Sequence, residues 1–114
     1  MTGGVPRTIE LYGELDLHTA RELAPTLSEA VGDVSRALVV DLRRVTFMDS
    51  TLLGALARAA GQMRNQGRKV TLIRVPGSPI DRLLEVSGLS DSFALLSEPG
   101  ETPAGSSSDP AAAA

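Results

Sequence analysis

Hydrophobic and polar residues repeat with two different periods along this chain. The first is the two-residue alternation that is typical of β-strands. Apolar side chains alternate with polar ones over residues 8–15, which is typical of a strand with one buried face. Gly13 interrupts this segment and predicts a bulge or a close backbone approach. Residues 37–42 are a mostly apolar run, which predicts a central strand of a parallel sheet, covered on both faces. Two further strands are expected at 70–75 and 93–96.

The second period is that of helices, and it first appears after residue 18. Thr19 is the expected N-cap of a helix, and Glu22 three residues later completes a capping-box pattern. Gly32 is the expected end of this helix. Pro25 lies inside it and predicts a kink or an irregular first turn, because an interior proline removes a helix hydrogen bond. The side chains expected on its buried face are Ala20, Leu23, Ala24, Leu27 and Val31.

Two more helices are expected further along the chain. One spans residues 50–66 and ends at Gly67. The other begins with Ser78 as N-cap and Pro79 at its first position, and Gly88 closes it. The expected buried positions are Leu52, Leu53, Leu56, Ala60 and Met63 in the first of these helices, and Ile80, Leu83, Leu84 and Ser87 in the second.

Strands and helices alternate along the chain, and this order predicts the fold class. It is typical of an α/β domain in which helices pack on a mostly parallel sheet, here of about four strands. The 114 residues suit one small domain, which we expect over 7–97. Residues 98–114 are rich in Pro, Gly, Ser and Ala without a pattern that could bury apolar surface, so they are expected to form a disordered tail.

Composition excludes several classes of function. The formal net charge is −3 and no basic stripe with aromatic residues is visible, so nucleic acid is not an expected partner. The chain has no Cys, which excludes disulfides and thiolate metal ligands. The sequence shows no signal-peptide pattern and no apolar run of the roughly 20 residues that a membrane helix needs. We therefore expect a cytoplasmic location and no membrane association.

The sequence contains no motif that is typical of an enzyme's active site. His18 is the only histidine, and the sequence lacks the Gly-x-Ser-x-Gly pattern of a nucleophile elbow; His18 is interpreted as a loop residue just before a helix cap. Lys69 is the only lysine, and no phosphate-binding glycine loop precedes it. No carboxylates are spaced to hold a metal ion. We therefore expect no catalytic residues, no cofactor and no metal.

The junction between the strand at 37–42 and the helix at 50–66 contains three short polar residues, Asp49, Ser50 and Thr51. Such side chains satisfy the unpaired N–H groups of a helix start, and a cap is the simplest interpretation. The alternative is a hydroxyl displayed for modification or for a partner. Helical spacing places Thr51 on a solvent-facing stripe together with the residues Gly54, Ala55 and Arg58. A simple solvated face would have the same pattern.

Several segments resemble a known family. They are Gly13-Glu14-Leu15-Asp16 followed by Thr19-Ala20, Val39-Val40-Asp41-Leu42, Val45-Thr46-Phe47-Met48-Asp49-Ser50-Thr51, and the helix at 80–84 with Ser87-Gly88-Leu89. Over about residues 7–97 the chain is similar to the STAS family, and more narrowly to the bacterial anti-sigma factor antagonists. The most specific part is the Asp-Ser-Ser/Thr signature after an aliphatic strand.

The resemblance implies a regulatory binding module and not an enzyme. In this family the unmodified protein binds an anti-sigma factor that is also a serine/threonine kinase, and this binding frees a sigma factor. The kinase phosphorylates the third residue of the signature, here Thr51, with Ser50 as the alternative, and a phosphatase resets the switch. The residues that the resemblance assigns to partner binding are Asp16, Asp49, Ser50, Thr51, Gly54 and Arg58.

An alternative within the same family is a scaffold module that is not phosphorylated and that serves a larger signalling assembly or a transporter complex. Two features favour it. Leu52 stands where the family usually has Gly, and the chain has little room for the family's first strand before Thr8 or for its last helix.

Overall fold

The computed structural model describes residues 6–97, and the predicted tail at 98–114 lies outside this range. Strands and helices alternate in the expected order. They are β1 (Arg7–Leu15), α1 (Leu17–Gly32), β2 (Leu38–Met48), α2 (Ser50–Asn65), β3 (Val70–Ile73), α3 (Pro79–Ser87), the short 3-10 helix η1 (Ser90–Ser92) and β4 (Phe93–Leu96).

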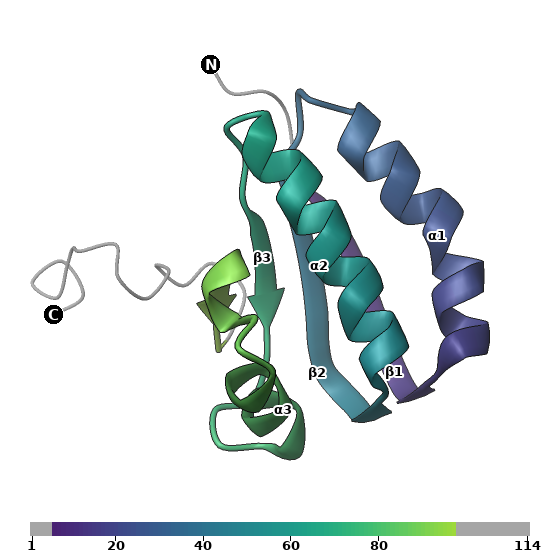
Figure 1. Cartoon of the computed structure of the whole chain (residues 1–114), viewed down its shortest axis with the longest axis vertical. Helices are drawn as coiled ribbons and strands as arrows, with labels where there is room; N and C mark the ends of the chain where they lie inside the picture. Colours follow the sequence, from purple (N-terminus) through teal and green to yellow (C-terminus); the bar gives the residue numbers. More distant parts are fainter. Residues whose placement is uncertain (1–5, 98–114) are drawn as a thin grey trace, which may run out of the picture.

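The strands form one sheet with the spatial order β1-β2-β3-β4, and every neighbouring pair is parallel. Figure 1 shows α2 in front of β1 and β2 and α1 beside it at the right, both beginning near the ends of the strand arrows. The α/β fold with a parallel sheet of four strands is therefore confirmed. Because the strands are parallel, the start of each following helix lies at the same edge of the sheet.

A single hydrophobic core lies between the helices and one face of the sheet. Buried side chains of all three helices belong to one cluster with alternate residues of β2, including Leu38, Val40 and Leu42. All five positions expected on the buried face of α2 are in this core, and Leu52 and Met63 are fully inaccessible to solvent. Burial of this face is the main stabilising contribution to α2, since propensity alone rarely holds a helix of this length.

The beginning of α1 differs from the expectation. Asp16, not Thr19, is the N-cap, and Thr19 forms the capping box with Asp16. The first turn is regular, and α1 continues through Pro25 as one helix. The inner face of α1 follows Ala20, Leu23, Leu27 and Ala30, and Ala24 is exposed at the side of this stripe, so the expected burial of Ala24 is wrong. The other residues expected on this face are buried or half-buried.

The second strand also differs from the expectation. It is central, but β2 runs on to Met48, and within residues 6–97 the helices cover only one of its faces. Two register shifts against β1 explain its length, one of them between Gly13 and Glu14, where Gly13 has φ +83°. Such shifts insert extra residues into one strand and bend it. The bulge predicted at Gly13 is therefore confirmed, and the prediction that both faces of β2 are covered is wrong.

The face of the sheet opposite the helices contains a buried carboxylate. Asp41 is only 8% exposed, and Arg43 from the same strand binds it with a fork: Nε to Oδ1 at 3.0 Å and Nη2 to Oδ2 at 2.8 Å. The backbone N–H of Arg43 also donates to Oδ1 at 3.1 Å. This ion pair allows an acidic residue to lie within an otherwise apolar run.

Asp41 makes the stability of the fold dependent on pH. The hydrogen bonds from Arg43 lower the pKa of Asp41 against the opposing effect of burial. The folded state then binds its proton less readily than the unfolded state, so the stabilisation is complete above about pH 4 and is lost as the pH falls through the lowered pKa. Urea unfolding between pH 2 and 7 should show a shallower acid loss of unfolding free energy in Asp41→Asn than in wild type. Identical slopes would contradict this role.

The third helix follows its predicted signals at both ends. Ser78 Oγ accepts a hydrogen bond from Asp81 N, Pro79 occupies the first position, and Gly88 ends the helix with φ +76°. Ser87 was expected on the buried face but is exposed, and its hydroxyl donates to Leu84 O. Asp81 is buried instead, because it accepts hydrogen bonds from Gly77 N at 2.7 Å and from Arg74 Nε at 3.1 Å.

Candidate functional site

The candidate site is the edge of the sheet where β2 ends and α2 begins. Asp49 is the N-cap of α2, and its Oδ1 accepts hydrogen bonds from Thr51 N at 3.0 Å and Leu52 N at 3.2 Å. Its own N–H donates to Leu15 O at 3.0 Å, which joins the ends of β1 and β2. The capping interpretation of Asp49 is thus correct. It leaves the side chains of Ser50 and Thr51 exposed on a rigid corner.

A second helix start lies beside the first. Asp16 follows the last residue of β1 and caps α1, with Oδ1 accepting from Thr19 N at 3.1 Å. This hydrogen bond, followed by that of the Thr19 hydroxyl, lowers the pKa of Asp16. Since Leu15 and Met48 are register partners, Asp16 and Asp49 follow neighbouring positions of the sheet. The tertiary structure therefore brings together two residues that are far apart in the sequence.

The residue after Thr51 points the other way. Leu52 is fully buried in the core below α2, whereas Thr51 is exposed. A side chain at this position therefore fills the core and does not narrow the surface around the Thr51 hydroxyl.

The remaining predicted site residues continue along α2. Gly54 is half-buried and Arg58 is exposed, and a Cβ built on Gly54 would lie 3.6 Å from Arg58 Nη1. Arg58 also lines a groove of about 210 Å³ between α1 and α2, together with small side chains such as Ala24 and Ala55. Of the stripe expected to face solvent, Thr51 and Arg58 are exposed, whereas Gly54 and Ala55 are half-buried and Ala55 packs against the core.

The single histidine of the chain lies in an exposed pair on α1. His18 lies in the first turn of α1, not in a loop as expected, and its Nε2 is 3.3 Å from Glu22 Oε2 in an exposed pair. Across the described part of the chain, no group of three or more His, Asp or Glu residues could hold a metal ion. None of the helices described there is long and apolar enough to cross a membrane.

The cap at Asp49 gives a direct test of its structural contribution. Replacing Asp49 by Ala removes the acceptor for two backbone N–H groups, and we expect a loss of about 1 kcal/mol in unfolding free energy. Chemical denaturation of the two proteins measures this difference, with Asp91→Ala as a matched control because no side chain caps η1. An unchanged stability would show that Asp49 does not act as a cap.

Comparison with known proteins identifies the class to which this fold and site belong. Residues 2–97 match the family model described as "Mlab, STAS domain". An anti-sigma-B factor antagonist of Staphylococcus aureus is 32% identical over 83 residues, which cover 73% of this chain and 76% of the relative. The anti-sigma-F factor antagonist RsfB of Mycobacterium tuberculosis is 36% identical over 89 residues, 78% of this chain and 71% of the relative. The chain belongs to the STAS domain family and, within it, to the anti-sigma factor antagonists.

Solved structures support the same fold. The unphosphorylated form of the anti-sigma factor antagonist SpoIIAA superposes with a TM-score of 0.56 at 24% identity, covering 68% of this chain and 69% of the other. The phosphorylated form of SpoIIAA, a Bacillus cell fate determinant, gives a TM-score of 0.59 at 24% identity, with 80% and 82% covered.

Proposed function

We propose that this protein binds an anti-sigma factor that is also a serine/threonine kinase, and thereby frees a sigma factor in the cytoplasm. Phosphorylation of Thr51 ends this binding, and a phosphatase restores it. The observation that carries the proposal is the exposed Thr51 hydroxyl, on a corner that Asp49 fixes through two backbone hydrogen bonds. Relatives at 32% and 36% identity are antagonists of anti-sigma factors, and SpoIIAA has been solved in a phosphorylated form.

A phosphate at Thr51 would be compatible with the fold and incompatible with a buried interface. It adds roughly −1.5 to −2 charge at neutral pH. At the second residue of α2 the helix dipole favours an anion, so the domain should stay folded. The same charge would lie close to Asp49 and would have to be desolvated against the partner, which is costly without a cationic group there. The folded state is kept and the complex is lost.

Mass spectrometry of the protein from its native cells tests the modification. The tryptic peptide 45–58 contains Thr46, Ser50 and Thr51, and fragmentation distinguishes these three hydroxyls. Phosphate on Thr51 is the expected result, and phosphate on Ser50 would keep the mechanism but change its site. A well-detected peptide without phosphate under growth and stress conditions would contradict the switch and favour a STAS scaffold that is not phosphorylated.

Gly54 allows the interface to be tested separately from stability. Gly54→Ala adds a methyl group at ordinary contact distance from Arg58 and replaces a poor helix former, so we expect up to about 1 kcal/mol of added stability. If the partner packs closely on α2, the same methyl group weakens binding. Gly61→Ala is the matched control, because its Cβ would lie 3.7 Å from Arg64 Nη2 further along the helix. Equal affinities for the two variants would place Gly54 outside the interface.

A further inference from the structure

An open hollow lies on the face of the sheet opposite the helices. Between the register pairs Glu10–Asp41 and Tyr12–Arg44, β1 advances by two residues and β2 by three. The extra residue places Arg43 and Arg44 both in exposed positions, while the next residue of β2, Val45, is again buried against the helices. The result is a cavity of about 200 Å³ whose lining includes Glu10, Tyr12 and the two arginines. β-Bulges commonly redirect side chains next to functional sites.

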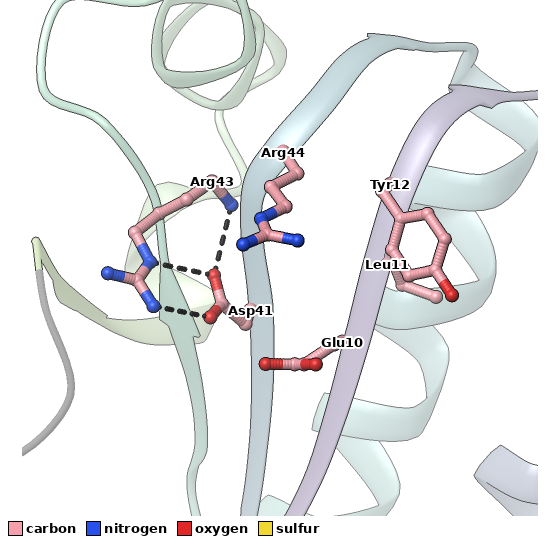
Figure 2. A pocket seen from close by; sticks show the side chains of 6 residues that line it. All are labelled: Glu10, Leu11, Tyr12, Asp41, Arg43 and Arg44. Atoms are coloured by element: carbon pink, nitrogen blue, oxygen red, sulfur yellow. Dashed lines mark hydrogen bonds and ion pairs between the residues drawn. The ribbon is translucent and has the colours of Figure 1, made fainter.

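The charges in this hollow are not equivalent. Figure 2 shows Arg43 folded back onto Asp41, whereas Arg44 lies between this ion pair and Tyr12. Within residues 6–97 the Arg44 guanidinium has no ion-pair partner. The hollow therefore offers an aromatic ring and a cation on neighbouring strands, beside the Glu10 carboxylate. Tyr and Arg are side-chain types enriched at the centres of protein interfaces.

The hollow lies three register pairs before the strand ends that carry the candidate site. Phe47 is 52% exposed, is the register partner of Glu14, and precedes the cap Asp49 by two residues. Tyr12 is 67% exposed and lies one register pair before the second bulge. Leu17 is 46% exposed and directly follows the cap Asp16. Three of the large exposed hydrophobic side chains thus lie around the ends of β1 and β2. Such clustering marks interaction surfaces more than scattered exposure does.

Size and charge decide what the hollow can bind. The cavity of about 200 Å³ has room for a side chain of a protein partner, and a second cavity of about 290 Å³ on the same face shares Glu10, Asp41 and Arg43 with it. We propose that the anti-sigma factor partner extends its contact from Thr51 across the sheet edge onto this face. It inserts an apolar side chain beside Tyr12, and a neighbouring carboxylate pairs with Arg44. This inference rests on the proposed function, because it extends the same interface.

Binding measurements on the full chain test this extension. Each anti-sigma factor kinase of the source organism is first purified and titrated against the wild-type chain. The kinase that binds most tightly is then used as the probe. Tyr12→Ala and Arg44→Glu should each weaken binding by about tenfold or more, and Arg44→Lys should retain most of the affinity. Val86→Ala is the control, since Val86 is 79% exposed on α3 outside the hollow, and it should bind like wild type. Thermal unfolding verifies that all variants fold.

The outcomes separate the two proposals. If Tyr12→Ala and Arg44→Glu bind within twofold of wild type while Thr51→Asp binds weakly, the hollow is not part of the interface and the proposed function stands. If Val86→Ala weakens binding as much as Tyr12→Ala does, the effect is not specific to the hollow and the extension is wrong. If no anti-sigma factor kinase binds the wild-type chain, the proposed function fails and this inference fails with it.

Discussion

Replacing Thr51 by Asp is expected to weaken binding to the anti-sigma factor partner by about a hundredfold, which corresponds to roughly 3 kcal/mol. The variant places a permanent carboxylate at the second position of α2, within reach of the Asp49 cap. Both this carboxylate and that of Asp49 must lose water when the partner binds, which is costly without a cationic group in the partner. Isothermal titration of the variant against the purified kinase measures the loss.

The same substitution should leave the fold intact. Thr51 is exposed, and an acidic residue in the first turn of a helix is favoured by the helix dipole. Its unfolding free energy should therefore stay within about 0.5 kcal/mol of wild type, as for most surface substitutions. Thr51→Val keeps the shape of the side chain but cannot be phosphorylated, so its complex should persist in the presence of ATP. Wild-type affinity in Thr51→Asp would overturn the role of Thr51 as the switch.

The largest expected loss of stability comes from Arg68, a residue far from the candidate site. Its guanidinium donates to the backbone carbonyls at the end of α1 and in the following loop: Nη1 to Val31 O at 3.0 Å, and Nη2 to Ala30 O at 3.0 Å and to Asp33 O at 2.9 Å. A further hydrogen bond from Nη2 reaches Arg36 O. One side chain thus satisfies a helix end that lacks a residue in the left-handed conformation, since the C-cap Asp33 has φ −93°.

Arg68→Ala is expected to lower the unfolding free energy by about 3 kcal/mol, because partly buried carbonyls lose charged donors and water replaces them poorly. Urea denaturation followed by circular dichroism measures the change. Arg68→Lys should recover only part of the loss, since a lysine cannot donate in a fork. Arg64→Ala is the matched control at an exposed position at the end of α2, and it should cost less than about 0.5 kcal/mol. Equal losses in Arg64→Ala and Arg68→Ala would refute the special role of Arg68.

Local signals predicted most of the elements correctly. Ser78 and Pro79 begin α3 where expected, and Gly88 ends it, because caps depend on the side chains of a few adjacent residues. The start of α1 was misplaced because two capping patterns overlap there. Asp16 with Thr19 and Thr19 with Glu22 have the same spacing, and only the complete helix shows that Asp16 has the extended backbone of a cap.

The pattern of β2 was less informative. A run of apolar residues predicts burial, but it does not say whether a helix or a neighbouring side chain covers each face. In the part of the chain that the structure describes, Arg43 two residues later covers Asp41, and no helix does. Gly13 indicated the second bulge, but the first, which forms the hollow beside Tyr12, is visible only in the pairing with β1, because register is a property of two strands.

The sequence by itself determined the order of the elements, the inner face of α2 and the display of Thr51 at a helix start. These features depend on contacts between residues that are close in the chain, so the spacing of hydrophobic and capping residues predicts them. Only the tertiary structure decided that Asp16 and Asp49 lie on adjacent strand ends, that Arg68 completes the end of α1, and that within residues 6–97 one face of the sheet is open around Tyr12 and Arg44. Each of these joins residues far apart in the chain, whose meeting is set by strand order and packing and not by any local pattern.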